Sequence, residues 1–82
     1  MGYHKANIKK GVLGESSKIQ EELDELVDAE AQGAKIMALC ELSDIIGAIR
    51  AYLEKKHPDT TLDDLLCMSR LTESAFKDGH RT

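Results

Sequence analysis

The chain of 82 residues has few of the features that mark several large classes of protein. It contains one proline, and its 41% hydrophobic and 32% charged residues are typical of a globular protein rather than a disordered one. No segment approaches the roughly 18 consecutive apolar residues of a membrane span. The segment Met1 to Leu13 also lacks the apolar run of a signal peptide. We therefore expect a soluble, cytoplasmic protein that does not enter membranes.

Positive charge and cysteine are also scarce. Eleven Lys and Arg stand against 15 Asp and Glu, which gives a net charge of −4. Because phosphate backbones are bound by basic surfaces, we do not expect nucleic acid as a partner. The two cysteines, Cys40 and Cys67, have no CxxC or Cys/His spacing, and their apolar neighbours predict reduced thiols in a core.

The hydrophobic periodicity predicts an all-α fold, a small helical bundle built on an antiparallel helical hairpin. The first helix is expected to begin at Ser16 or Ser17, with Gln20 as the capping-box partner of Ser17. It is expected to end at Gly33, which supplies the positive φ of a turn. The second helix is expected to run to about His57.

The third helix is expected to begin at Thr60 or Thr61, after the proline, and to stop at Gly79. The whole chain, 1–82, is then one helical domain with a basic N-terminal arm (1–14) and a basic C-terminal tail (77–82). The arm has two interpretations. It is either a frayed chain end or a flap that brings Tyr3 or His4 over a ligand.

Apolar residues cover most of the circumference of the second helix, so we expect it to be buried and central. Gly47 costs about 1 kcal/mol relative to Ala inside a helix, which predicts close approach of another helix or a ligand. A domain of this size has a marginal core of its own. We therefore predict a homodimer or homotetramer with a core of the four-helix type.

Four carboxylates are placed symmetrically about the predicted turn. Glu22 and Glu25 lie eleven and eight positions before Gly33, while Glu41 and Asp44 lie eight and eleven positions after it. In an antiparallel pair of helices, all four then lie roughly 12 to 17 Å from the turn. Burying such charges is costly unless they are paired or bind metal, so the arrangement predicts a cation site.

The first helix is unusually acidic, with seven acids and only Lys18 as a base between Glu15 and Glu30. On a helical wheel at 100° per residue, Glu21, Asp24 and Asp28 face away from the apolar stripe. We expect these three to be solvated.

The segments Glu21-Glu22-Leu23-Asp24-Glu25 and Glu41-Leu42-Ser43-Asp44 resemble the EExxE…ExxD signature of the MazG-like all-α nucleoside triphosphate pyrophosphohydrolases. This resemblance covers roughly Glu15 to Leu53. It implies a helical oligomer that binds magnesium, with manganese as a substitute, and cleaves a nucleoside triphosphate to a monophosphate and pyrophosphate.

The resemblance also implies roles for particular residues. Glu22, Glu25, Glu41 and Asp44 match the metal ligands, and Glu21 matches the remaining catalytic acid of the motif. The cations best placed in the sequence for substrate phosphates are Arg70, Lys77 and Arg81, together with Lys18. Surface solubility is the alternative explanation for these cations.

Two other classes of protein are alternatives to this family. Glu54 and His57 have the Glu-x-x-His spacing of di-iron bundles, but the pair stands beside Pro58 and has no second copy in the sequence. The non-enzymatic alternative is a small helical interaction module whose acidic face binds a basic protein. Stabilisation by millimolar Mg²⁺ would distinguish a metal site from such a solvated face.

Overall fold

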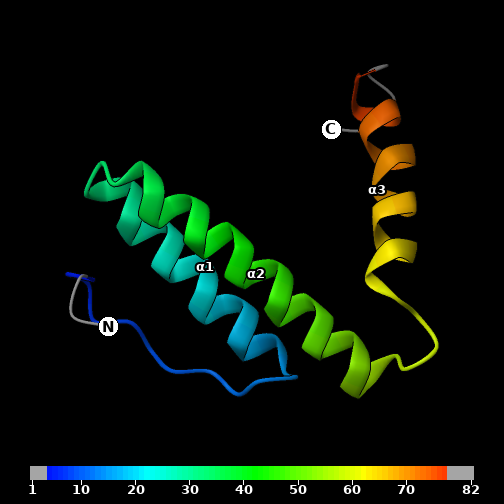
Figure 1. The fold of residues 1–82 in the computed structure, drawn as a ribbon, viewed down its shortest axis with the longest axis horizontal. Coiled ribbons are helices and arrows are strands. Elements are labelled where there is room, and N and C mark those ends of the chain that lie inside the picture. The colour runs from blue at the N-terminus through cyan, green and yellow to red at the C-terminus, as the bar shows by residue number, and fades with distance from the viewer. Residues whose placement is uncertain (1–3, 78–82) are drawn as a thin grey trace.

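The computed structural model describes residues 4–77, and this part of the chain is helical without any strand (Figure 1). Its elements are α1 (Ser16–Ala31), α2 (Lys35–Lys56) and α3 (Leu62–Lys77). The predicted all-α class is therefore confirmed. The predicted stop at Gly79, the tail after Lys77 and the arm residue Tyr3 lie outside the described residues.

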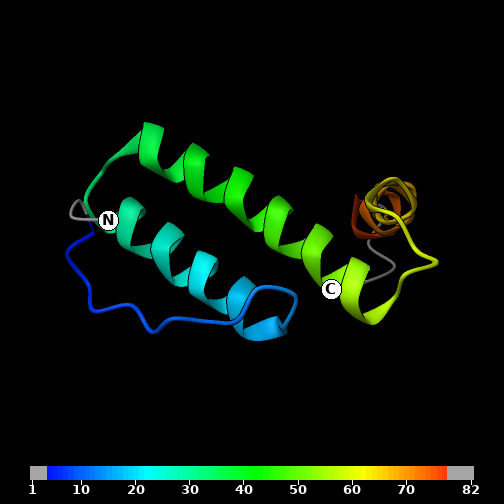
Figure 2. The same ribbon diagram turned by 60° about the horizontal axis from the view of Figure 1, so that its bottom comes forward.

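Helices α1 and α2 lie side by side and run in opposite directions (Figures 1 and 2). Between them, the amide of Gly33 donates to the Glu30 carbonyl and the amide of Ala34 donates to the Ala29 carbonyl, both at 3.0 Å. Gly33 has a φ of 69°, a conformation that favours glycine. The predicted positive φ of Gly33 is confirmed.

The starts of the helices follow the sequence prediction in one case and not in another. At α3, the Thr61 amide donates to the Asp64 carboxylate at 2.9 Å, and the Asp64 amide donates to the Thr61 hydroxyl at 3.1 Å. At α1, no side chain caps the first turn. The predicted capping box is wrong because the Ser17 hydroxyl accepts from the Val12 amide and Gln20 donates to Asp24.

The N-terminal arm, described here for residues 4–14, has no helix of its own and runs along α1 (Figure 2). Two carboxylates of α1 hold it there. The amides of Lys5 and Ala6 donate to Asp28 at 3.1 and 3.0 Å, and the amide of Gly11 donates to Glu21 at 2.7 Å. These bonds argue against a frayed chain end, whereas a flap over a ligand stays a prediction.

Helix α3 stands apart from the other two helices (Figure 1). It contacts α2 at the end where the two are joined and makes no contact with α1. None of its residues is buried. Its apolar side chains, such as Leu66, Leu71 and Phe76, are exposed.

The apolar core of the described chain is very small. Only Ala29, Ala48 and Leu53 are buried hydrophobic residues among residues 4–77. The prediction of a buried α2 is wrong for the single chain because α1 covers only one of its faces. Its exposed large side chains are Ile36, Leu39, Leu42 and Ile46.

Two further predictions about packing are wrong for the described chain. Cys40 and Cys67 are free thiols, as expected, but both are exposed rather than in a core. A Cβ added at Gly47 would meet no atom within 4 Å, so no helix of the described chain approaches this glycine closely, whereas the approach of a ligand stays a prediction. Among the described helices, none has the length and apolar character needed to span a membrane.

Candidate metal centre

Four carboxylates of α1 and α2 converge where the two helices face each other. Glu22 and Glu25 extend from α1, and Glu41 and Asp44 extend from α2. One oxygen of each lies within 4.8 Å of one oxygen of every other. We call these four residues the acidic cluster. Their convergence, predicted from the spacing about Gly33, is confirmed, whereas their role as metal ligands stays a prediction.

The acidic cluster is buried at its centre. Glu41 is fully buried and Glu22 is 6% exposed, while Glu25 is half-buried and Asp44 is exposed. The Oε2 atoms of Glu22 and Glu41 are buried without a hydrogen-bond partner in the described part of the chain. A buried acceptor without a partner costs about 1 to 3 kcal/mol, and more when it is charged. Such oxygens favour a nearby proton or cation.

Electrostatics within the acidic cluster point the same way. Burial raises the pKa of the Glu22 carboxyl, and the neighbouring Glu25 raises it further, although Lys18 opposes the shift. Burial also raises the pKa of Glu25, with a second contribution from Glu41 beside it. The ionised forms of both carboxyls are therefore disfavoured at this position, and any positive charge would relieve them.

Lys18 supplies part of that charge at the edge of the cluster. Its Nζ lies 3.2 Å from Glu22 Oε1 and 3.3 Å from Glu21 Oε1. Burial lowers the pKa of Lys18, but the hydrogen bonds to Glu22 and Glu21 outweigh burial and raise the pKa above its usual value. The structure thus places Lys18 beside the acids, where it pairs with carboxylates.

Glu21 was expected to face solvent, and this expectation is wrong. It is 3% exposed because the arm covers it, and it accepts the Gly11 amide and pairs with Lys18 and Lys10. The Gly11 hydrogen bond is the main reason why the pKa of Glu21 is lowered. In this structure Glu21 anchors the arm, and its assignment as a catalytic acid stays a prediction.

Asp28 was also expected to face solvent, and this expectation is wrong for the same reason. It is 7% exposed and lies close to four donors, which are His4 Nδ1, the amides of Lys5 and Ala6, and Gln32 Nε2. These groups, with His4 as the largest contribution, lower the pKa of Asp28. Asp24, by contrast, is partly exposed and accepts a hydrogen bond from Gln20 on the same helix.

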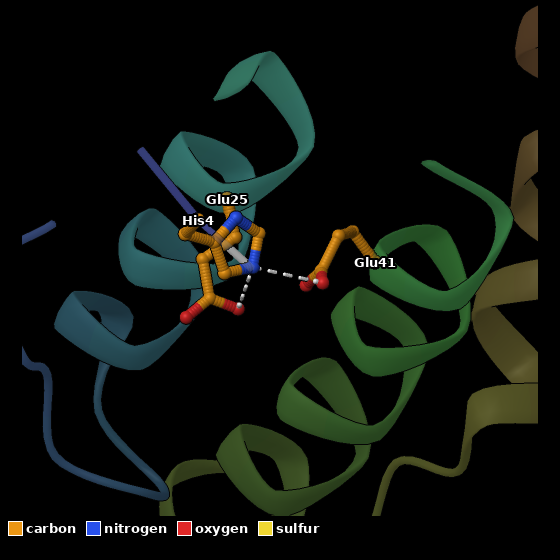
Figure 3. A group of neighbouring side chains, drawn as sticks. All are labelled: His4, Glu25 and Glu41. Atoms are coloured by element: carbon orange, nitrogen blue, oxygen red, sulfur yellow. Dashed lines mark hydrogen bonds and ion pairs between the residues drawn. The ribbon is translucent and has the colours of Figure 1, made fainter. Parts of the chain in front are cut away.

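His4 links the arm to the acidic cluster (Figure 3). Its Nδ1 lies 2.9 Å from Asp28 Oδ2, and its Nε2 lies 3.2 Å from Glu41 Oε1 and 3.9 Å from Glu25 Oε2. Burial lowers the pKa of His4, but the hydrogen bond with Asp28 and the charges of Glu25 and Glu41 together raise it. The sequence offered His4 only as a possible flap residue, because the arm has no periodicity that would place it.

Of the described cations predicted to bind phosphates, Lys18 lies beside the acidic cluster, whereas Arg70 and Lys77 do not. Lys77 pairs with Glu73 on α3 at 2.7 Å, and Arg70 is exposed on the same helix, which makes no contact with α1. Arg81 lies outside the described residues. Glu54 and His57 are exposed near the end of α2 and take no part in the cluster. The phosphate-binding roles stay predictions.

Comparison with known proteins adds no relative, because no protein-family model, curated protein or solved structure matches this chain.

Proposed function

We propose that this protein is a Mg²⁺-dependent nucleoside triphosphate pyrophosphohydrolase, which converts a (d)NTP and water into a (d)NMP and pyrophosphate. The observation that carries the proposal is the acidic cluster, in which two helices bring four carboxylates together and bury two oxygens without partners. The MazG-like spacing of the same residues in the sequence supports the same assignment.

The donor set fits magnesium. Mg²⁺ prefers carboxylate oxygens and retains several waters, and the cluster combines buried oxygens of Glu22 and Glu41 with an exposed carboxylate of Asp44. Mn²⁺ can substitute because it accepts the same ligands. Bound there, such an ion would neutralise phosphate oxygens, activate a water and stabilise the leaving pyrophosphate.

The chain itself contributes the position of the ligands and the exclusion of water. Glu22 and Glu41 are held on two packed helices, so their oxygens need little rearrangement to bind an ion. Asp44, at the exposed side, leaves room for a triphosphate to complete the coordination. Arg70, Lys77, Arg81 and Lys18 are the proposed phosphate contacts, and the two on α3, Arg70 and Lys77, require an approach to the cluster that α3 does not make in the described chain.

We also propose that α1 and α2 act as a helical hairpin that assembles into a homodimer or homotetramer. The large side chains Ile36, Leu39, Leu42 and Ile46 follow one stripe of α2, with 46 to 79% of each exposed. On a wheel at 100° per residue, this stripe lies opposite Glu41. Pairing the stripe with a second copy would bury it in a four-helix core. A partner could then also bring its α3 towards the acidic cluster.

The test of the catalytic proposal is release of pyrophosphate from a panel of canonical and modified nucleoside triphosphates at millimolar Mg²⁺. We expect Glu41→Gln to lower kcat by at least about a hundredfold, because it removes a charge from the metal site. The control is Asp24→Asn on the same helix, whose side chain bonds to Gln20 at the surface. Wild-type turnover in Glu41→Gln, or equal losses in the two variants, would refute the proposal and favour an acidic interaction module.

A further inference from the structure

His4 brings an imidazole nitrogen to two members of the acidic cluster, and neither acidic motif of the sequence includes it. One side of the ring is fixed by Asp28, whose oxygens also accept the amides of Lys5 and Ala6 and the side chain of Gln32. A carboxylate surrounded by donors acts as an acceptor, so Nδ1 of His4 carries a proton. Nε2 lies on the other side of the ring, where its contact with Glu41 Oε1 is a hydrogen bond that a bound metal ion would replace, with release of the Nε2 proton.

Nε2 faces two carboxylates (Figure 3). Nε2 lies 3.2 Å from Glu41 Oε1 and 3.9 Å from Glu25 Oε2. His4, Glu25 and Glu41 each offer one ligand atom, and these three atoms lie within 4.8 Å of one another. Ligand atoms about 2.0 to 2.2 Å from a tetrahedral ion are separated from one another by roughly 3.3 to 3.6 Å. The two nitrogen-to-oxygen distances lie on either side of that range, so a small shift of side chains would complete the geometry.

A second, independent observation supports a ligand at this position. Glu41 is fully buried, and its Oε2 has no hydrogen-bond partner in the described part of the chain. The His4 side chain is only 7% exposed, so its ring is held in the interior of the protein. The carboxylate that orients the histidine is itself typical of metal sites, in which the second ring nitrogen donates to an outer carboxylate.

We propose that His4, Glu25 and Glu41 bind a divalent transition metal of the Zn²⁺ class, with Asp28 as the positioning residue for the imidazole. An imidazole with two carboxylates suits such an ion, whereas Mg²⁺ prefers oxygen ligands alone. The site shares Glu25 and Glu41 with the proposed magnesium site. Its argument rests on the placement of His4 and is independent of whether the protein hydrolyses nucleotides.

The test is the affinity for Zn²⁺, measured by competition with a chromophoric chelator in the full chain. Cys40 and Cys67 are exposed thiols, so both are replaced by serine in every protein compared. His4→Ala is compared with His57→Ala, which removes an exposed imidazole at the end of α2. Loss of an outer partner alone typically costs roughly 10- to 100-fold in metal affinity, so loss of the ligand in His4→Ala should weaken Zn²⁺ binding at least tenfold.

The outcomes separate this site from the proposed hydrolase. We expect His57→Ala to bind Zn²⁺ like the parent protein, and His4→Ala to keep its Mg²⁺ affinity within about twofold, since Mg²⁺ does not need the imidazole. His4→Gln, which keeps a polar side chain in the same place, should lose Zn²⁺ affinity to a similar extent, and circular dichroism checks that all variants stay helical.

Unchanged Zn²⁺ affinity in His4→Ala overturns the proposal. Tighter binding overturns it too, because His4 would then be an internal cation that competes with the metal. Absence of nucleotide hydrolysis would leave the result intact.

Discussion

The buried and exposed faces of α2 have the opposite polarity to those of an ordinary helix in a small protein. The face towards α1 holds Glu41, which is fully buried, whereas the opposite face exposes aliphatic side chains such as Ile36 and Leu39. Burying an aliphatic side chain contributes about 1.5 to 3 kcal/mol, while burying an unpaired charge costs free energy. This reversal is the reason for the two proposals above, a cation bound at one face and a protein surface that covers the other.

The largest expected effect concerns the exposed aliphatic face. Leu39→Glu places a charge in the stripe, so if that stripe is an interface between copies, the dissociation constant of the oligomer should rise by at least about 30-fold. Sedimentation equilibrium at micromolar concentration measures this change. Ser16→Glu is the control because Ser16 is an exposed polar residue at the start of α1, outside the stripe. A compact monomer for the unmodified protein would break the comparison, because the aliphatic face would then be simply solvated.

An intermediate effect is expected on the acidic face. Burial and Glu25 raise the pKa of Glu22, so its ionised form costs stability above its folded pKa, and stability is regained as the pH falls through that pKa. Glu22→Gln removes the cost at neutral pH. We expect Tm in EDTA to rise by about 4 to 8 °C, since relief of one buried repulsion is of order 1 kcal/mol.

The same measurement with metal sharpens the comparison. Millimolar Mg²⁺ should raise the Tm of the unmodified protein, because a ligand that binds only the folded state stabilises it. In Mg²⁺ the unmodified protein should then have a higher Tm than Glu22→Gln, which is the reverse of the order in EDTA. Equal amounts of NaCl serve as the control for general screening. A Tm that falls in Glu22→Gln without metal would contradict the inference that burial of the ionised Glu22 costs more than its pairing with Lys18 restores.

The smallest expected effect is at a carboxylate with the opposite surroundings. Glu15 pairs with Lys55 and Lys56, and the hydrogen bonds to these two lysines lower its pKa. Its contribution to stability is present above the unfolded pKa and is lost as the pH falls through the folded pKa. Glu15→Gln should therefore lower Tm slightly at pH 7 and have no effect near pH 2. A rise in Tm at pH 7 would show that the sign of the shift is wrong.

The sequence predicted the helices and the acidic cluster because both depend on local spacing. Gly33 fixes the turn, and the equal separations of Glu25 and Glu41 from it place the two carboxylates opposite each other. A helical wheel requires only the period of the helix. The positions of residues around a helix can therefore be read from the sequence of that helix alone.

The burial of Glu21 and Asp28 could not be predicted in the same way. A wheel describes one helix and assigns every residue away from its apolar stripe to solvent, but here the arm covers that side of α1. The arm has no apolar period, so nothing in its sequence gives its path. The apolar circumference of the second helix likewise predicted that residues such as Leu39 are buried, but Leu39 is exposed. An aliphatic stripe does not tell whether its partner belongs to the same chain or to another.

The two anchors of the arm have a consequence for the exchange of amide protons with solvent. Lys5, Ala6 and Gly11 donate their amides to carboxylates that are less than a tenth exposed, although the segment forms no regular secondary structure. In a hydrogen–deuterium experiment these three amides should exchange more slowly than those of Lys9 and Lys10 between the anchors. Their protection would report the release of His4 from the interior, because the arm must leave Asp28 before the imidazole can do so.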